Sequence, residues 1–126
     1  MSEPSAAPGI VLSDDLMFAS RITGTARTLG LTVRPARSVD ILKELAGKQC
    51  PACVILDLGH PGLEVKGLLG WLQATCTPPP RVVAYGSHVD TETLRAAREA
   101  GCDLVLPRSK FVQDLPQQLP AWLTPE

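Results

Sequence analysis

Carboxylates follow two short apolar runs of this sequence. Asp57 comes directly after the run 53–56, while Asp14 and Asp15 follow the run 10–12 and Ser13. Each run indicates a strand, and the run 53–56, with two β-branched residues, is typical of a strand buried on both faces. Neighbouring parallel strands lie about 5 Å apart and end at one edge of a sheet, so we expect the three carboxylates to converge. Such a cluster needs a cation or protons to neutralise it, and Mg²⁺ with retained waters is the natural candidate.

The elements that must position these carboxylates alternate between strands and helices. Gly30, Gly47 and Gly101 favour helix ends, and Pro35 favours an edge position for its strand. Because Pro116 fits only the first turn of a helix, we expect a turn over 107–111 and a short last helix that begins near Asp114. The predicted strands are 9–13, 31–35, 52–57, 81–85 and 103–106, and the other predicted helices are 15–29, 39–47, 63–74 and 89–100. This alternation predicts an α/β fold with a doubly wound, five-stranded parallel sheet in the order 2-1-3-4-5.

Length and composition restrict the class of protein. The 126 residues predict one domain over 9–126 behind a flexible arm at 1–8, and the apolar fraction of 44% suits an α/β core. A net charge of −1 gives no electrostatic basis for binding nucleic acid or a membrane. The sequence shows neither a membrane-spanning apolar run nor the features of a signal peptide, so we expect a cytoplasmic protein.

The four cysteines do not by themselves predict disulfides in a domain of this size. Cys50 and Cys53 have the spacing of a redox or zinc pair, but they lead into a strand rather than a helix. Zinc would need a second close pair, which Cys76 and Cys102 do not form in the sequence. We therefore interpret Cys50 and Cys53 as packing residues.

Several residues resemble the motifs of response-regulator receiver domains, the CheY-like family of the CheY/flavodoxin-like fold. The acidic pair Asp14–Asp15, the aspartate Asp57 that ends the third strand, Gly59 two residues later and the pair 100–101 all match. The resemblance implies that Asp57 accepts a phosphoryl group, with Mg²⁺ held by Asp14, Asp15, Asp57 and the carbonyl of Gly59. It implies a signalling protein of a two-component phosphorelay rather than an enzyme. The partner of such a protein is a histidine kinase or an output protein.

The sequence departs from that family where the phosphorylation signal would be read. Gly86 stands at the position of the switch hydroxyl, with Ser87 one residue further on as its candidate replacement. Arg108 takes the place of the strand-five lysine, and Val105 that of the aromatic relay residue. Two functions therefore remain open: a stand-alone receiver with a degraded switch, or a pseudo-receiver that binds a protein partner without phosphorylation. In either case we expect phosphorylation of Asp57 to be uncoupled from switching.

Two classes of cofactor protein with related folds fit less well. A flavodoxin-type protein needs a phosphate-binding loop after its first strand, where this chain carries Asp14 and Asp15. A cobalamin-binding domain needs an Asp-x-His-x-x-Gly loop after its first strand, and the nearest string, around His60, has other spacing and another place. We therefore expect no organic cofactor.

Overall fold

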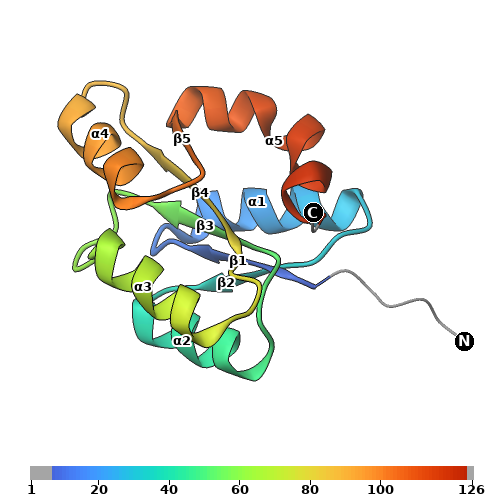
Figure 1. Ribbon diagram of the computed structural model, residues 1–126. Helices are drawn as coiled ribbons and strands as arrows, with labels where there is room; N and C mark the ends of the chain where they lie inside the picture. The colour runs from blue at the N-terminus through green and yellow to red at the C-terminus, as the bar shows by residue number, and fades with distance from the viewer. Residues whose placement is uncertain (1–6, 125–126) are drawn as a thin grey trace, which may run out of the picture.

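The core of the protein is a parallel sheet of short strands. The computed structural model describes residues 7–124 of the chain. The strands are β1 (Gly9–Leu12), β2 (Val33–Ala36), β3 (Cys53–Asp57), β4 (Arg81–Gly86) and β5 (Leu104–Pro107). They are parallel and lie in the order β2-β1-β3-β4-β5, which confirms the predicted fold class (Figure 1). β2 lies at an edge, as its proline predicted.

Helices cover both faces of this sheet (Figure 1). One apolar cluster joins the sheet to α1 (Leu16–Thr28) and α5 (Arg108–Trp122). The other cluster joins the opposite face to α2 (Val39–Lys48), α3 (Val65–Thr75) and α4 (Thr91–Ala100). Right-handed crossover connections between the parallel strands produce this division into two helical layers.

The central strand, β3, places Asp57 at the carboxyl edge of the sheet. β3 lies between β1 and β4, and each of its residues is buried. Leu56 is in register with Leu12 of β1, and Asp57 with Tyr85 of β4. Asp57 therefore ends β3 at the carboxyl edge of the sheet, with β1 on one side and β4 on the other.

Polar side chains cap the helices that lead away from this edge. Asp15 accepts a hydrogen bond from the N–H of Phe18, and Ser38 accepts one from that of Ile41. These bonds satisfy backbone donors that the first turn of a helix leaves unpaired. Gly101 ends α4 with φ of 112°, a left-handed conformation that glycine adopts without strain.

The last helix differs from the prediction. It begins at Arg108 rather than near Asp114, and it continues through both Pro116 and Pro120. A continuous buried stripe explains this, because side chains on one side of the helix pack against the sheet: Phe111, Leu115, Leu119 and Trp122. This packing outweighs the two backbone hydrogen bonds that the prolines remove. Figure 1 shows the helix axis turning partway along its length, as expected for a helix with internal prolines.

Several predicted boundaries shift in the structure. The first helix was predicted over 15–29 and spans Leu16–Thr28, and Leu16 and Leu29, at its two ends, are 59% and 39% exposed. Pro8 is buried, and its carbonyl accepts a hydrogen bond from Ala52. Residues 1–6 of the predicted arm lie outside the described residues.

Two of the cysteines form a disulfide, so the interpretation of Cys50 as a packing residue was wrong. Cys50 and Cys76, 26 residues apart in the sequence, are joined with their Cα atoms 5.7 Å apart. The sequence gives no direct signal for this pairing, because it depends on how α2 and α3 are placed by the sheet. Cys53 is buried in β3 and is a packing residue, as expected.

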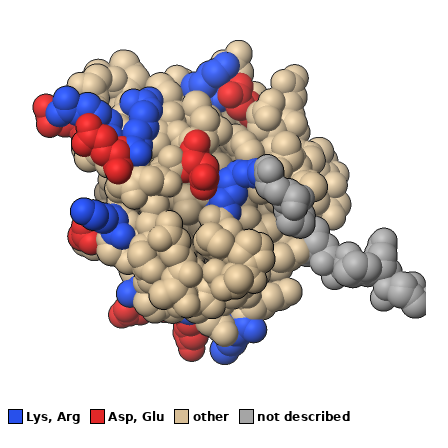
Figure 2. Space-filling model, in the orientation of Figure 1, with Lys and Arg blue, Asp and Glu red and all other residues tan. Residues whose placement is uncertain are grey.

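The surface carries charges of both signs. Figure 2 shows Lys and Arg interspersed with Asp and Glu, and a broad uncharged area in the lower part of this face. The mixture is consistent with the net charge of −1. Over residues 7–124, no helix is both long enough and apolar enough to cross a membrane.

Candidate functional site

Asp57 is the buried carboxylate around which the site is arranged. Its side chain lies at the carboxyl end of β3, and the residue is only 5% exposed. Oδ1 accepts a hydrogen bond of 2.9 Å from the backbone N–H of Gly59. Oδ2 accepts one of 3.3 Å from the hydroxyl of Ser13. Donors therefore contact both oxygens of this carboxylate, as burial of a charged group requires.

Ser13, which the sequence analysis did not assign to the site, lies beside Asp57 in the position where an acidic residue was expected. β1 ends at Leu12, which is in register with Leu56 of β3. The residues that follow these two, Ser13 and Asp57, therefore lie side by side. The residue is 1% exposed, and its oxygen also accepts a hydrogen bond from the N–H of Asp15. Counting residues from the end of each apolar run would have revealed this pairing.

The predicted acidic pair lies further along the chain, at the surface. Asp14 and Asp15 are both exposed, and Asp15 uses its carboxylate to cap α1. Within residues 7–124, no three Asp, Glu, His or Cys side chains are placed together in a way that could hold a metal ion. The expected convergence of Asp14, Asp15 and Asp57 is therefore not found in this structure.

Arg108 provides the positive charge nearest to Asp57. Its Nη2 lies 3.9 Å from Oδ2 of the carboxylate, and 48% of the arginine side chain is exposed. The guanidinium also lies over two aromatic rings, 4.7 Å from the centroid of Phe18 and 5.6 Å from that of Tyr85. Stacking of this kind favours the planar arginine over a lysine and holds the guanidinium beside the carboxylate.

Tyr85 contributes a buried hydroxyl beside the carboxylate. The residue is 0% exposed, and within residues 7–124 no group is placed to form a well-directed hydrogen bond with its hydroxyl, although the Ser13 side chain lies close enough to lower its pKa. Burial, followed by the negative charge of Asp57, raises the pKa of Tyr85 well above its usual value, while the nearby Ser13 and Arg108 act in the opposite direction. The ring packs against Phe18 and Phe111, with centroids 5.0 and 4.7 Å apart. Tyr85 is therefore fixed in its neutral form at neutral pH.

Apolar side chains fill the space around Gly86, the expected switch position. A Cβ atom added to Gly86 would lie 3.3 Å from Cδ2 of Leu94 and 3.4 Å from Cβ of Leu58. Ser87 is exposed, and its oxygen lies 3.4 Å from the N–H of Val89 as a weak acceptor. Val105 is buried at 5% exposure in the cluster that also contains Leu94.

Several of the predicted residues, but neither Asp14 nor Asp15, meet around one hollow. Its volume is about 360 Å³, and it opens at the carboxyl edge of the sheet. Its walls combine a carboxylate, a guanidinium and hydroxyl groups: Asp57, Gly59, Gly86, Ser87, His88, Arg108 and Ser109. The hollow has room for a small oxyanion, but Asp57 already has a cationic partner there.

The residues present do not fit a tightly held Mg²⁺ ion. Mg²⁺ binds proteins through carboxylate and carbonyl oxygens in nearly octahedral geometry. Here Ser13 directs a hydroxyl donor at Oδ2 of Asp57, and the Arg108 guanidinium lies near the same oxygen. These donors occupy the face on which a cation would bind, and Arg108 would repel it.

Comparisons with known proteins address the fold. No protein-family profile matches the sequence, and no curated protein does. Among solved structures, the signal receiver domain of a response regulator from Bermanella marisrubri superposes with a TM-score of 0.81 at 21% identity, covering 95% of this chain and 100% of the other. The receiver domain of NtrX from Brucella abortus gives a TM-score of 0.77 at 20% identity, covering 91% and 97%.

These likenesses agree with the resemblance that the acidic motif indicated. At such low identity they establish the fold rather than the chemistry of Asp57. The strand order and the position of Asp57 at the end of β3 are those that the resemblance predicted. The protein therefore has the fold of a response-regulator receiver domain.

Proposed function

We propose that this protein is a signalling module of the pseudo-receiver type, which binds a protein partner without a phosphorylation-driven switch. The observation that carries the proposal is Gly86 at the position of the switch hydroxyl. A Cβ added there would lie 3.3 Å from Cδ2 of Leu94, closer than usual, and in ordinary contact with Cβ of Leu58 at 3.4 Å. A ligand at Asp57 therefore has no side chain at position 86 to draw inward.

The charge balance at Asp57 supports the same function. In a phosphoryl acceptor, a metal ion neutralises the carboxylate and the incoming oxygens. Here Arg108 and the Ser13 hydroxyl balance the carboxylate with the chain's own groups, so it needs no metal ion. A weak Mg²⁺ site at Asp14, Asp15, Asp57 and Gly59 remains a prediction, and the donors around Asp57 oppose it.

The aromatic residues near the site do not form the usual relay. Val105 is buried and lacks a ring, and a β-branched side chain is restricted in χ1. The rings of Tyr85 and Phe111 instead pack together under α1 and α5, with centroids 4.7 Å apart. A ligand shifts a conformational equilibrium only when its affinities for the two states differ. Neither Gly86 nor Val105 has a side chain that would give a ligand at Asp57 such a difference in affinity.

One observation favours the alternative in which Asp57 accepts a phosphoryl group. The hollow beside Asp57 is also lined by Arg108, Ser87 and Ser109, groups that can bind phosphate oxygens. Under that alternative, the oxyanion draws Arg108 away from the carboxylate, and Arg108 binds the oxyanion instead. The two functions predict different responses to a phosphate mimic.

The test is an amide NMR spectrum of the protein with Mg²⁺, recorded before and after addition of beryllofluoride. We expect no shifts, or shifts confined to the loops that contain Asp14, Asp57 and Gly86. Large shifts across residues 92–100 and 104–111 would show a working switch and overturn the proposal. Intact mass after incubation with Mg²⁺ and acetyl phosphate reports the chemistry separately, and an adduct that Asp57→Asn abolishes would establish the acceptor.

A matched variant shows whether a thermal melt can detect Mg²⁺ bound at the carboxyl edge of the sheet. Ser13→Asp places a second carboxylate beside Asp57, so 5 mM Mg²⁺ should raise its melting temperature by several degrees through preferential binding to the folded state. The wild-type protein should show a shift of less than about 1 °C under the same conditions. A wild-type shift as large as that of the variant would contradict the proposed metal independence.

A further inference from the structure

The disulfide lies at the edge of the sheet opposite Asp57. Cys50 belongs to the segment between α2 and β3, and Cys76 follows directly after α3. Both segments lead into strands, so the bond joins two connections at the amino ends of β3 and β4. The Cα–Cα distance of 5.7 Å lies in the usual range for disulfides, so these backbones are placed for the bond.

The two cysteines of this bond differ in their access to solvent. Cys50 is exposed, whereas Cys76 is 0% exposed. An external thiolate can therefore reach the disulfide through the sulfur of Cys50. The release of Cys76 as a thiolate and its reprotonation then take place in a buried environment.

The remaining cysteines are unsuited to exchange with the bond. Burial raises the pKa of Cys53 to about 12. Burial and then the charge of Asp103 raise the pKa of Cys102 to about 11. Both groups are therefore protonated thiols at neutral pH, and a thiol is a poor nucleophile compared with a thiolate. Neither competes with Cys50 for Cys76.

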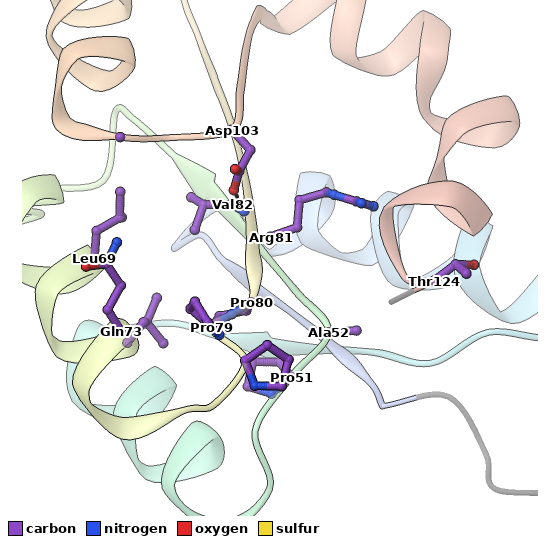
Figure 3. A pocket seen from close by; sticks show the side chains of 13 residues that line it. Pro51, Ala52, Leu69, Gln73, Pro79, Pro80, Arg81, Val82, Asp103 and Thr124 are labelled. Atoms are coloured by element: carbon purple, nitrogen blue, oxygen red, sulfur yellow. Dashed lines mark hydrogen bonds between the residues drawn. The ribbon is translucent and has the colours of Figure 1, made fainter. Parts of the chain in front are cut away.

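A hollow of about 410 Å³ lies between the two segments that the disulfide joins. Pro51 and Ala52, next to Cys50, form one wall, while Leu72, Gln73, Pro78 and Pro79, on either side of Cys76, form another. Figure 3 shows Pro51 beside Pro79 and Pro80, with Leu69 and Gln73 of α3 to one side. The disulfide therefore ties together two walls of this hollow.

The connector between Cys76 and β4 has few other means of attachment. Pro78, Pro79 and Pro80 carry no N–H, so none of them can donate a backbone hydrogen bond. Pro78 and Pro79 are also exposed, whereas Cys76 is buried. The next backbone donor is Arg81, whose N–H bonds to the carbonyl of Ala52. At its α3 end, the connector is held by the disulfide and by the N–H of Cys76, which donates to the carbonyl of Leu72.

We propose that Cys50–Cys76 is a redox-responsive clamp that holds the end of α3 and the connector 77–80 against the segment 50–52. A dithiol reduces it in two steps. Its first thiolate attacks the sulfur of Cys50, breaks the S–S bond and releases the sulfur of Cys76, which takes up a proton. The second thiol of the reagent loses its proton and attacks the mixed disulfide, so the reagent becomes a cyclic disulfide and Cys50 a thiol. The reduced clamp lets the walls of the hollow separate.

The first experiment establishes the pairing. Protein purified without reductant is unfolded in guanidinium, alkylated with iodoacetamide and weighed as an intact chain. We expect alkylation of two of the four cysteines, and of all four after treatment with dithiothreitol. Peptide mapping should place the two labels on Cys53 and Cys102. Alkylation of all four cysteines without reductant, even after exposure to oxidised glutathione, would overturn the proposal.

The second experiment measures the effect of the clamp on stability. Loss of the cross-link over a separation of 26 residues should lower the melting temperature by about 10 °C in dithiothreitol. Cys50→Ser, at an exposed position, should melt at the lower temperature whether or not reductant is present. Cys102→Ser is the matched control and should keep the full response. A fully reduced wild-type protein that melts at the oxidised temperature would overturn the proposal.

Hydrogen exchange locates the effect within the fold. In the reduced protein the amides of 72–77 and of Arg81 should exchange through local opening, at least about tenfold faster than those of β1 and of the inner residues of β3, which exchange through global unfolding. Equal exchange rates for the two sets in the reduced protein would show only the global loss of stability that follows from removing a cross-link, and would count against a local clamp.

Discussion

Gly86 is the single residue that most restricts what the site can do. Gly86→Thr would restore the missing hydroxyl, but its Cβ would lie 3.3 Å from Leu94 and 3.4 Å from Leu58. We expect the variant to lose about 1–3 kcal/mol of unfolding free energy, since overpacking a filled site forces neighbours out of position. Urea titration at pH 7 measures the change.

A second substitution separates overpacking from other effects. Leu94→Ala removes the Cδ2 atom that lies 3.3 Å from the added Cβ, whereas Leu58→Ala would keep the Cβ atom that lies 3.4 Å from it. In the Leu94→Ala background, Gly86→Thr should cost at least about 0.5 kcal/mol less, which a double-mutant cycle reveals as a coupling energy. Simple additivity of the two changes would mean that Leu94 does not crowd position 86.

Tyr85 offers a second prediction at the scale of one residue. Tyr85→Phe removes a buried hydroxyl that has no hydrogen-bond partner within residues 7–124. The ring contacts with Phe18 and Phe111 do not depend on the hydroxyl. We therefore expect the unfolding free energy at pH 7 to rise by about 1 kcal/mol. A fall in stability would show that the hydroxyl makes a favourable interaction.

The pH dependence of the same variant follows from the raised pKa of Tyr85. Below pH of about 10 the hydroxyl is protonated in both the folded and the unfolded chain, so its contribution is constant. Above that pH the unfolded chain ionises first, and the stability falls as the pH rises towards the folded pKa. Tyr85→Phe should lose less stability than the wild type between pH 9 and 11. Tyr85 is the only tyrosine in the sequence, so absorbance at 295 nm reports its ionisation directly.

Among the elements, α5 shows how tertiary packing overrides local preference. The two prolines predicted that the last helix begins near Asp114, but the buried stripe of four large side chains keeps the helix continuous from Arg108. Pro116 is exposed, so Pro116→Ala loses little packing and restores a donor to the carbonyl of Val112. We expect a gain of about 1–2 kcal/mol, after the greater entropy of the unfolded chain is subtracted.

Gln117→Ala, at the next exposed position of α5, serves as the control and should change stability by less than about 0.5 kcal/mol. Chemical denaturation of the two variants and the wild type makes the comparison. Lower stability in Pro116→Ala would mean that the bend of the helix is itself needed to seat Trp122, which is 5% exposed.

The features that could be predicted from the sequence are those set by neighbouring residues. Periodicity and caps located nearly every strand and helix, and strict alternation gave the strand order. Asp57 was placed correctly because a buried strand runs directly into it. Ser13 was missed because its role depends on register, which a shift of one residue changes completely. The disulfide was missed because it joins residues that only the folded sheet brings together.

For the whole molecule, the two edges of the sheet have different characters. The carboxyl edge carries Asp57 with Arg108, and the amino edge carries the disulfide and its hollow. Cytoplasmic thiols are kept reduced, whereas disulfides persist in oxidising compartments. The cytoplasmic location is still a prediction, and in that compartment we expect the clamp in its reduced form.

The disulfide has a further consequence for the connectivity of the molecule. Between Cys50 and Cys76 the oxidised chain is a closed ring, and this ring contains β3 and the whole of α3. A backbone break in the exposed turn around Pro61 would leave both fragments attached to one another through sulfur. The oxidised molecule would then keep the strand that bears Asp57 and the helix after it in one covalent piece. Reduction would divide the same nicked molecule into two chains.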